Sequence, residues 1–236
     1  MLNDIPYEGG ATPTPLTEEE IKEYVGLYAQ AAKNSIAASF DGVEVHGANG
    51  YLIDQFIQDI SNNRTDAWGG SVEKRARFGI EAAKAVVEAV GADRTGFRMS
   101  PYSEFQGMRM KDPKPQFAYL AQELKKLKLH RFGSTDVEAT ENVDFLVDIW
   151  DNQSPVLIAG GFTQDSAKRA ADEEYKGKDV AIVFGRYFIS NPDLVFRVEK
   201  GIEFTPYDRK TFYSKGEEGY TTWPFSKEFE AQALKL

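Results

Sequence analysis

The sequence predicts an α/β fold in which helices and strands alternate and the strands form one parallel sheet. Segments with apolar residues at helical spacing alternate with short, continuous apolar runs, which are typical of buried parallel strands. Each of these runs ends in Gly, Arg, His or Ser. Of the 236 residues, 42% are apolar, which is enough for a core. Because functional groups gather at the carboxyl ends of parallel strands, the site is predicted there.

The first helix is predicted after the proline-containing segment "TPTP". Thr17 is followed three residues later by Glu20, which is the pattern of a capping box at a helix start. The strand predicted next, residues 42–46, reads "GVEVH" and is rich in β-branched residues. Such a run is expected where both faces of a strand are covered.

A second long helix is predicted over residues 71–90, capped by Ser71 and ended by Gly91, and a strand over residues 95–101. The remaining predicted helices are 115–129, 142–150, 164–175 and 192–201, and the remaining predicted strands are 154–161 and 179–186. Between two of these helices the alternation requires one more strand. The segment "HRFGSTDVEATE" has no apolar run of sufficient length, so the sequence predicts that this strand is missing.

Composition excludes several classes of function. The formal charge is −9, with 28 basic residues scattered among 37 acidic ones, so a basic face for nucleic acid is not expected. No apolar run approaches ~20 residues and the first residues lack a signal-peptide pattern, which predicts a cytoplasmic protein without a membrane partner. With no cysteine and two histidines, neither disulfides nor a metal site are expected.

The segment "VEVHGANGYL" places His46, Asn49 and Tyr51 around a glycine-rich turn at the end of a predicted strand. Taken alone, such a histidine is commonly structural, and Tyr51 could be a core aromatic. Arg98 lies inside a predicted apolar strand, where a guanidinium needs an anionic or carbonyl partner. These four residues are the polar groups that the predicted sheet places at its carboxyl end.

Four separated segments, in the same order, resemble the old yellow enzymes. They read "FDGVEVHGANGYLIDQFIQDISNNRTDAWGGSVEKRARF", "FRMSPYSEF", "PVLIAGGF" and "FGRYFISNPDL". These flavoproteins are FMN-dependent ene-reductases on a (β/α)8 TIM barrel, and the resemblance is to their fungal branch that serves secondary metabolism. It runs from Leu16 to about Phe225.

The resemblance implies a single domain over residues 1–236 that is an incomplete (β/α)8 barrel. Met1 falls just before the fourth strand unit of the family, so the first three strands have no counterpart, and the sixth strand is predicted to be deleted between Leu129 and Arg131. Four strands cannot close a barrel with a filled interior, which needs about eight. Uncovered parallel edges therefore predict a homo-oligomer or a complementing fragment.

For the reaction, the resemblance implies that His46 and Asn49 donate hydrogen bonds to the carbonyl oxygen of an unsaturated substrate. It implies that Tyr51 protonates the carbon that hydride does not attack. Two donors aimed at one oxygen stabilise the charge that develops there, by ~3 kcal/mol for each donor. With a reference pKa near ~10, tyrosine is a proton donor at neutral pH.

For the cofactor, the resemblance implies FMN, with NADPH as the reductant. Arg98 matches the cation beside the pyrimidine end of the flavin. Gly160, Gly161, Gly185 and Arg186 match the phosphate site after the seventh and eighth strands. Glycines there let backbone N–H groups approach phosphate oxygens.

Three functions stay open on the sequence. The first is an FMN-linked oxidoreductase that reduces the activated C=C bond of an α,β-unsaturated aldehyde or ketone. The second is a flavin-independent isomerase or cyclase that uses the same carbonyl-binding residues. The third is a non-catalytic partner subunit.

Overall fold

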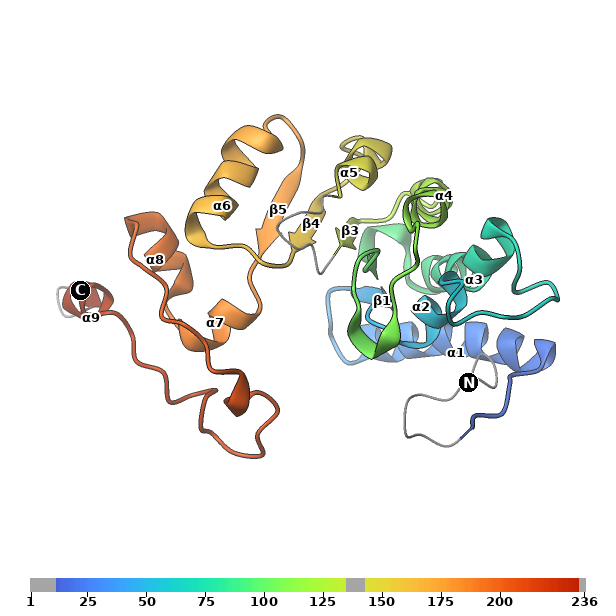
Figure 1. The fold of residues 1–236 in the computed structure, drawn as a ribbon, viewed down its shortest axis with the longest axis horizontal. Coiled ribbons are helices and arrows are strands. Elements are labelled where there is room, and N and C mark those ends of the chain that lie inside the picture. Colours follow the sequence, from blue (N-terminus) through green and yellow to red (C-terminus); the bar gives the residue numbers. More distant parts are fainter. Residues whose placement is uncertain (1–11, 135–142, 234–236) are drawn as a thin grey trace. The chain divides into compact units, whose positions relative to one another are not determined.

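The fold was analysed in a computed structural model, which describes residues 12–134 and 143–233. Helices and strands alternate along the chain (Figure 1). The strands are β1 (Val43–Gly47), β2 (Thr95–Met99), β3 (Arg131–Ser134), β4 (Val156–Ala159) and β5 (Val180–Val183). The helices are α1 (Glu18–Ala37), α2 (Leu52–Ile57), α3 (Val72–Val90), α4 (Lys114–Lys125), α5 (Asp144–Trp150), α6 (Gln164–Arg169), α7 (Arg186–Ser190), α8 (Leu194–Lys200) and α9 (Lys227–Ala233).

The strands form one five-stranded sheet in the order β1-β2-β3-β4-β5. The first three neighbouring pairs are parallel, with His46 opposite Arg98 and Arg98 opposite Gly133. The predicted α/β fold with a parallel sheet is confirmed. Because β1 and β2 are parallel, their carboxyl ends lie next to each other at one edge of the sheet.

The prediction of a missing strand between Leu129 and Arg131 is wrong. β3 begins at Arg131 and pairs with β2 on one side and β4 on the other, so the sheet has no gap. The strand escaped the apolar pattern because it is four residues long and contains Gly133 and Ser134. Phe132 supplies its core contact, fully buried and stacked on the Trp150 ring at 4.3 Å.

The two long predicted helices are confirmed with their caps. The Thr17 N–H donates to Glu20 Oε2 at 2.7 Å and the Glu20 N–H donates to Thr17 Oγ1 at 3.2 Å, as a capping box requires. Ser71 accepts from the Lys74 N–H at the start of α3, and Gly91 ends that helix with φ 96°. Four predicted helices are shorter than expected. α4 ends at Lys125, and α5 and α8 span fewer residues than predicted. α6 ends at Arg169, and a π-helical turn, Ala170–Glu174, follows it. Asn142 lies outside the described residues. The sequence did not predict α2, α7 or α9.

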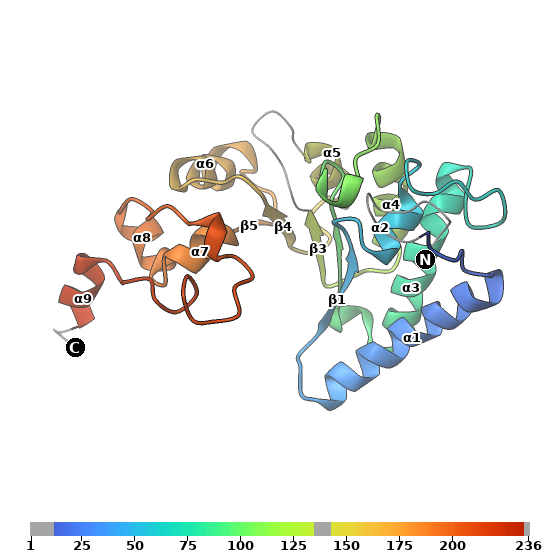
Figure 2. The ribbon, with the colours of Figure 1, turned by 60° about the horizontal axis from the view of Figure 1, so that its bottom comes forward.

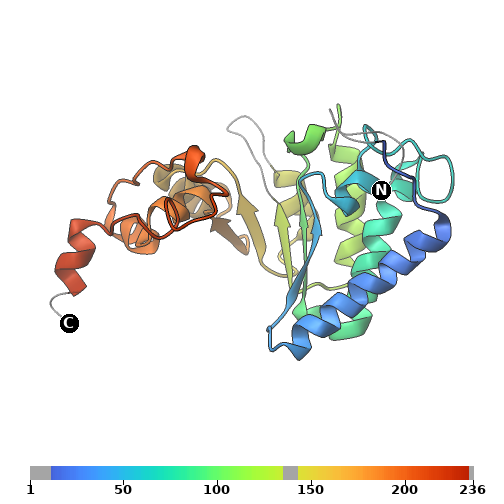
Figure 3. The ribbon, with the colours of Figure 1, turned by 90° about the horizontal axis from the view of Figure 1, so that it is seen from below.

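One face of the sheet carries the core. Val45, Phe97 and Phe132 alternate with polar or small residues and are buried against the helices, which Figure 3 shows on one side of β1 to β3. A Cβ at Gly47 would lie 2.6 Å from the Phe97 ring, so only glycine fits there. α1 lies beside α3, where Tyr28 meets the edge of Phe78 at 6.0 Å (Figure 2). The side chains of Glu44, His46 and Arg98 lie on the opposite face of the sheet.

The contacts group the chain into two compact units. The first comprises Met1–Gly161 and Gly177–Ala181, and the second comprises Phe162–Lys176 and Ile182–Leu236. Within the second unit, Asp193 accepts from Arg197 Nε at 2.8 Å and from the Ser226 N–H at 2.9 Å, which ties α8 to the segment before α9. The single domain expected from the sequence stays a prediction.

Candidate active site

His46 and Arg98 are neighbours on paired strands. They occupy the same register position of β1 and β2, so their side chains leave the same face of the sheet. Burial lowers the pKa of His46, and the positive charge of Arg98 lowers it further. The imidazole is therefore neutral at pH 7, with one N–H available as a donor.

Asn49 and Gly50 form a tight turn directly after β1. The Tyr51 N–H donates to the carbonyl of Ala48 at 3.3 Å, and both central residues have positive φ, 57° for Asn49 and 71° for Gly50. Asparagine and glycine are the residues that tolerate this left-handed backbone best. The Asn49–Gly50 turn is thus explained by conformation as well as by chemistry.

Two residues distant in sequence hold Asn49 in place. The Asn49 N–H donates to Ser100 Oγ at 2.8 Å, and Gln106 Nε2 donates to the Asn49 carbonyl at 3.1 Å. Ser100 is fully buried and follows β2 directly. Sequence reasoning missed both residues, although the position of Ser100 at a strand end marks it as a candidate.

A buried carboxylate lies beneath the same turn. Asp54 has no exposed surface, and its Oδ2 accepts from the Gly50 N–H at 2.8 Å. Its Oδ1 accepts from Gln58 Nε2 at 3.0 Å. Burial raises the pKa of Asp54 to about 6, although these hydrogen bonds act in the opposite direction. The sequence analysis missed Asp54, which is the only acid in the run "LIDQFI".

Tyr51 is the N-terminal neighbour of α2 and is 52% exposed. Its ring lies 5.3 Å from the His46 ring, centroid to centroid, at an interplanar angle of 51°. The structure therefore brings Tyr51 next to His46, with Asn49 between them in sequence and Arg98 on the adjacent strand. All four residues belong to the first compact unit.

Two buried polar atoms of this cluster lack a hydrogen-bond partner among the described residues. They are Asn49 Oδ1 and Arg98 Nε. Buried polar atoms are nearly always paired, so an unpaired acceptor and an unpaired donor in one cluster point to a ligand. An Arg98 donor fits the carbonyl oxygens at the pyrimidine end of a flavin. The residues present are therefore compatible with FMN at this position.

The residues predicted for phosphate binding belong to two different compact units. Gly160 and Gly161 follow β4 in the first unit, with φ of 126° and 62°. Gly185 and Arg186 belong to the second unit, where the Arg186 guanidinium lies 5.6 Å from the centre of the Tyr207 ring. Their shared role in phosphate binding stays a prediction.

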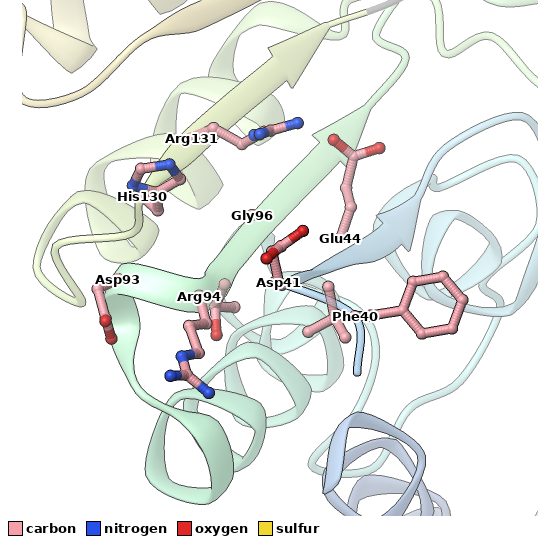
Figure 4. Close-up of a pocket in the computed structure, with 11 residues that line it drawn as sticks. Phe40, Asp41, Glu44, Asp93, Arg94, Gly96, His130 and Arg131 are labelled. Carbon is pink, nitrogen blue, oxygen red and sulfur yellow. The ribbon is translucent and has the colours of Figure 1, made fainter. Parts of the chain in front are cut away.

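A separate pocket of about 580 Å³ opens at the amino ends of β1, β2 and β3 (Figure 4). Its walls mix both charges, and Figure 4 shows Glu44 and Arg131 extending toward each other from β1 and β3. None of the predicted site residues lines it. The pocket lies at the opposite ends of the strands from His46 and Asn49.

No group of three or more His, Cys, Asp or Glu side chains is placed to hold a metal ion in the described part of the chain. Within residues 12–134 and 143–233, no helix has both the length and the apolar character that a bilayer crossing demands.

Curated relatives come from fungi. The chain is 58% identical over 228 residues to chanoclavine-I aldehyde reductase fgaOx3 of Penicillium roqueforti, covering 93% of this chain and 62% of that protein. It is 45% identical to NADP-dependent oxidoreductase lnbE of Aspergillus flavus, covering 94% of this chain and 64% of that protein. It is also 47% identical to a Claviceps purpurea protein named probable inactive dehydrogenase easA, covering 95% of this chain and 63% of the relative. The chain thus spans less than two thirds of each of these relatives.

Solved structures agree with this likeness. The old yellow enzyme of a Pichia species superposes with a TM-score of 0.85 at 36% identity, over 95% of this chain and 62% of the other. The homologue from Zymomonas mobilis gives 0.82 at 32% identity, over 92% of this chain and 62% of the other. The resemblance to old yellow enzymes and their barrel fold is confirmed.

Residues 7–205 match a protein family described as NADH:flavin oxidoreductase / NADH oxidase. This match covers most of the chain and confirms FMN as the cofactor of the family to which the predictions pointed. The chain belongs to the NADH:flavin oxidoreductase / NADH oxidase family.

Proposed function

We propose that this chain carries the carbonyl-binding site of an FMN-linked oxidoreductase that reduces the activated C=C bond of an α,β-unsaturated aldehyde or ketone. The observation that carries the proposal is the cluster of His46, Asn49, Tyr51 and Arg98 at the carboxyl ends of β1 and β2. The unpaired Asn49 Oδ1 and Arg98 Nε within it support a ligand there. Relatives named aldehyde reductase in fungi support a secondary-metabolic aldehyde as substrate.

The residues divide the work on the substrate. The neutral imidazole of His46 and the amide of Asn49 donate to the carbonyl oxygen and stabilise the enolate-like charge, by ~3 kcal/mol for each donor. Tyr51 holds a proton at its hydroxyl oxygen, close to His46 and open to solvent on one side. It delivers this proton to the carbon that does not receive hydride.

The same cluster contains the residue that would hold the flavin ring, Arg98. The resemblance to the family supports Gly160, Gly161, Gly185 and Arg186 as residues that would bind its phosphate. When bound, FMN supplies the hydride for the reduction. The name of the Aspergillus flavus relative supports NADPH as the source of electrons.

Turnover of an unsaturated aldehyde by FMN-loaded protein with NADPH tests the proposal. We expect a product heavier by two hydrogens, and a loss of roughly 10²-fold or more in kcat/KM when His46 and Asn49 are both replaced by Ala. Tyr51→Phe should leave flavin binding unchanged and slow only the reoxidation of reduced flavin by the enal. A product of unchanged mass would contradict reduction.

Flavin occupancy is a separate readout. Arg186→Ala should weaken FMN binding because a guanidinium contact to phosphate is lost. Lys210→Ala, which removes an exposed cation of the same unit, is the matched control. Equal occupancy in wild type and Arg186→Ala would show that Arg186 does not contact the phosphate.

A second candidate is a flavin-independent isomerase or cyclase. It is favoured by the containment of His46, Asn49 and Tyr51 in one compact unit, since carbonyl polarisation needs only these groups. The name probable inactive dehydrogenase, carried by a relative of similar identity, also favours chemistry other than reduction. Flavin-stripped protein would then convert the enal to a product of unchanged mass with a shifted double bond or a new ring.

A further inference from the structure

Asp54 is a buried acid, and no cation pairs with it within residues 12–134 and 143–233. It lies on α2, three residues after Tyr51, and its side chain has no exposed surface. Its hydrogen-bond partners in the described part of the chain are the Gly50 N–H and Gln58 Nε2, both uncharged. A buried carboxyl without a cation is costly to ionise, so its retention in a core position calls for a reason.

The polarity of the hydrogen bonds favours the ionised form. The Arg109 N–H donates to Gln58 Oε1 at 2.8 Å, and this backbone donor fixes the orientation of the Gln58 amide. Gln58 must then present its NH₂ group to Asp54. The Gly50 N–H meets the other carboxyl oxygen. Both oxygens of Asp54 therefore face donors, and a proton on either oxygen would weaken the hydrogen bond that this oxygen accepts.

The charged groups described on the elements packed around α2 have other partners, or no hydrogen bond to Asp54, and do not offset the cost of its ionisation. Glu44 and His46 are the titratable residues of β1, and Arg75 of α3 bonds Gln116 and the Gly70 carbonyl. Arg109 itself pairs with Glu104. Because burial outweighs the two hydrogen bonds, the pKa of Asp54 rises to about 6. The carboxyl is consequently ionised at pH 7 and takes up its proton in mildly acidic solution.

We propose that Asp54 is the positioning residue of the Asn49–Gly50 turn, and that proton uptake by its carboxylate releases the turn and switches off carbonyl binding. This inference rests on the proposed function, because Asn49 binds the carbonyl through a backbone that Gly50 shares. In the ionised state the carboxylate anchors the Gly50 N–H from below, while Ser100 anchors the Asn49 N–H. A proton on Oδ2 weakens the acceptor of the Gly50 N–H, so the turn loses the strength of this anchor.

Amide NMR of ¹⁵N-labelled protein tests the switch without substrate. The Gly50 amide signal should shift between pH 5 and 7 with a midpoint close to 6 in wild type. In Asp54→Asn, which keeps the shape and cannot ionise, this titration should vanish. Asp59→Asn, an equal change of charge at an exposed aspartate just beyond α2, should leave it intact. A Gly50 signal that does not titrate in wild type would overturn the proposal, and this measurement needs no variant to fold.

Enal turnover separates this proposal from the proposed function. KM should rise roughly tenfold in wild type as the pH falls from 7 to 5, and Asp54→Asn should show the raised KM already at pH 7. His46 also titrates in acid, but it does so in both proteins, so their difference isolates Asp54. Equal KM profiles in wild type and Asp54→Asn would overturn the proposal while the reductase stands. Gly50 titration without any turnover would support the switch and remove the reductase.

Discussion

At the scale of single residues, the candidate site is held by polar groups that bind backbone rather than ligand. Ser100 and Asp54 accept from the N–H groups of Asn49 and Gly50, and both are fully buried. A buried carboxylate that anchors a turn stabilises the geometry of the site and destabilises the fold. Such opposition between stability and function is common at active sites.

The stability cost of Asp54 should be visible in its pH dependence. Its pKa is raised from 3.8 to about 6 on folding, so between these values the folded state binds more protons than the unfolded state. The free energy of unfolding, relative to Asp54→Asn, should therefore fall by about 2 kcal/mol as the pH rises from 4 to 7. Urea unfolding of both proteins at several pH values measures it. A rise in this difference in unfolding free energy over the same pH range would contradict a raised pKa of the buried carboxyl.

Gly47 offers a second test at this scale. A Cβ there would lie 2.6 Å from the Phe97 ring, so Gly47→Ala should lower the free energy of unfolding by about 1–3 kcal/mol and shift His46, its neighbour. Gly26→Ala is the control, because Gly26 lies inside α1 and an added Cβ would meet no atom within 4 Å beyond its own helix. This control should stabilise the helix by about 0.5–1 kcal/mol. Thermal unfolding of both variants decides the matter.

At the scale of elements, β3 depends on one aromatic pair. Phe132 is its large apolar residue, and it stacks on Trp150 of α5 with ring planes 10° apart. The strand joins β2 to β4, so the sheet is continuous only if β3 stays in place. The contact with Trp150 of α5 thus stabilises a strand that has no long apolar run of its own.

Phe132→Ala should lower the free energy of unfolding by about 3–5 kcal/mol, because it empties a buried aromatic site. Arg131→Ala, at an exposed neighbour in the same strand, should change it by less than about 0.5 kcal/mol. Chemical denaturation compares the two variants. Similar losses in both would show that the strand is held by backbone pairing instead of the Phe132–Trp150 contact.

The sequence predicted those elements whose causes are local. The capping box of Thr17 and Glu20 and the glycine stop at Gly91 lie within a few residues of the helices they bound. β3 could not be predicted in this way, because its pairing partners lie tens of residues away on both sides. The pairing of His46 with Arg98 depends on the register of β1 and β2, which the sequence analysis did not predict. The role of Asp54 was not predicted either, since the amide orientation of Gln58 is set by Arg109, 51 residues later.

At the scale of the whole molecule, the sheet has two outer strands, β1 and β5. Parallel edges with free N–H and C=O groups favour pairing with another chain. We predict that the protein self-associates, and that light scattering gives at least twice the monomer mass of 26.4 kDa. A single species of monomer mass at micromolar concentration would contradict this prediction.

The left-handed backbone at residue 49 has a consequence for comparing relatives. Asparagine is kept there by two separate demands, the φ of 57° and the amide chemistry, so a lineage that abandoned catalysis would still favour Asn or Gly at this position. Its presence is therefore a weak marker of activity. Tyr51 carries no such conformational demand: it is 52% exposed and no described group bonds its hydroxyl. Loss of the tyrosine, rather than of the asparagine, would therefore distinguish reductases from relatives that no longer catalyse reduction.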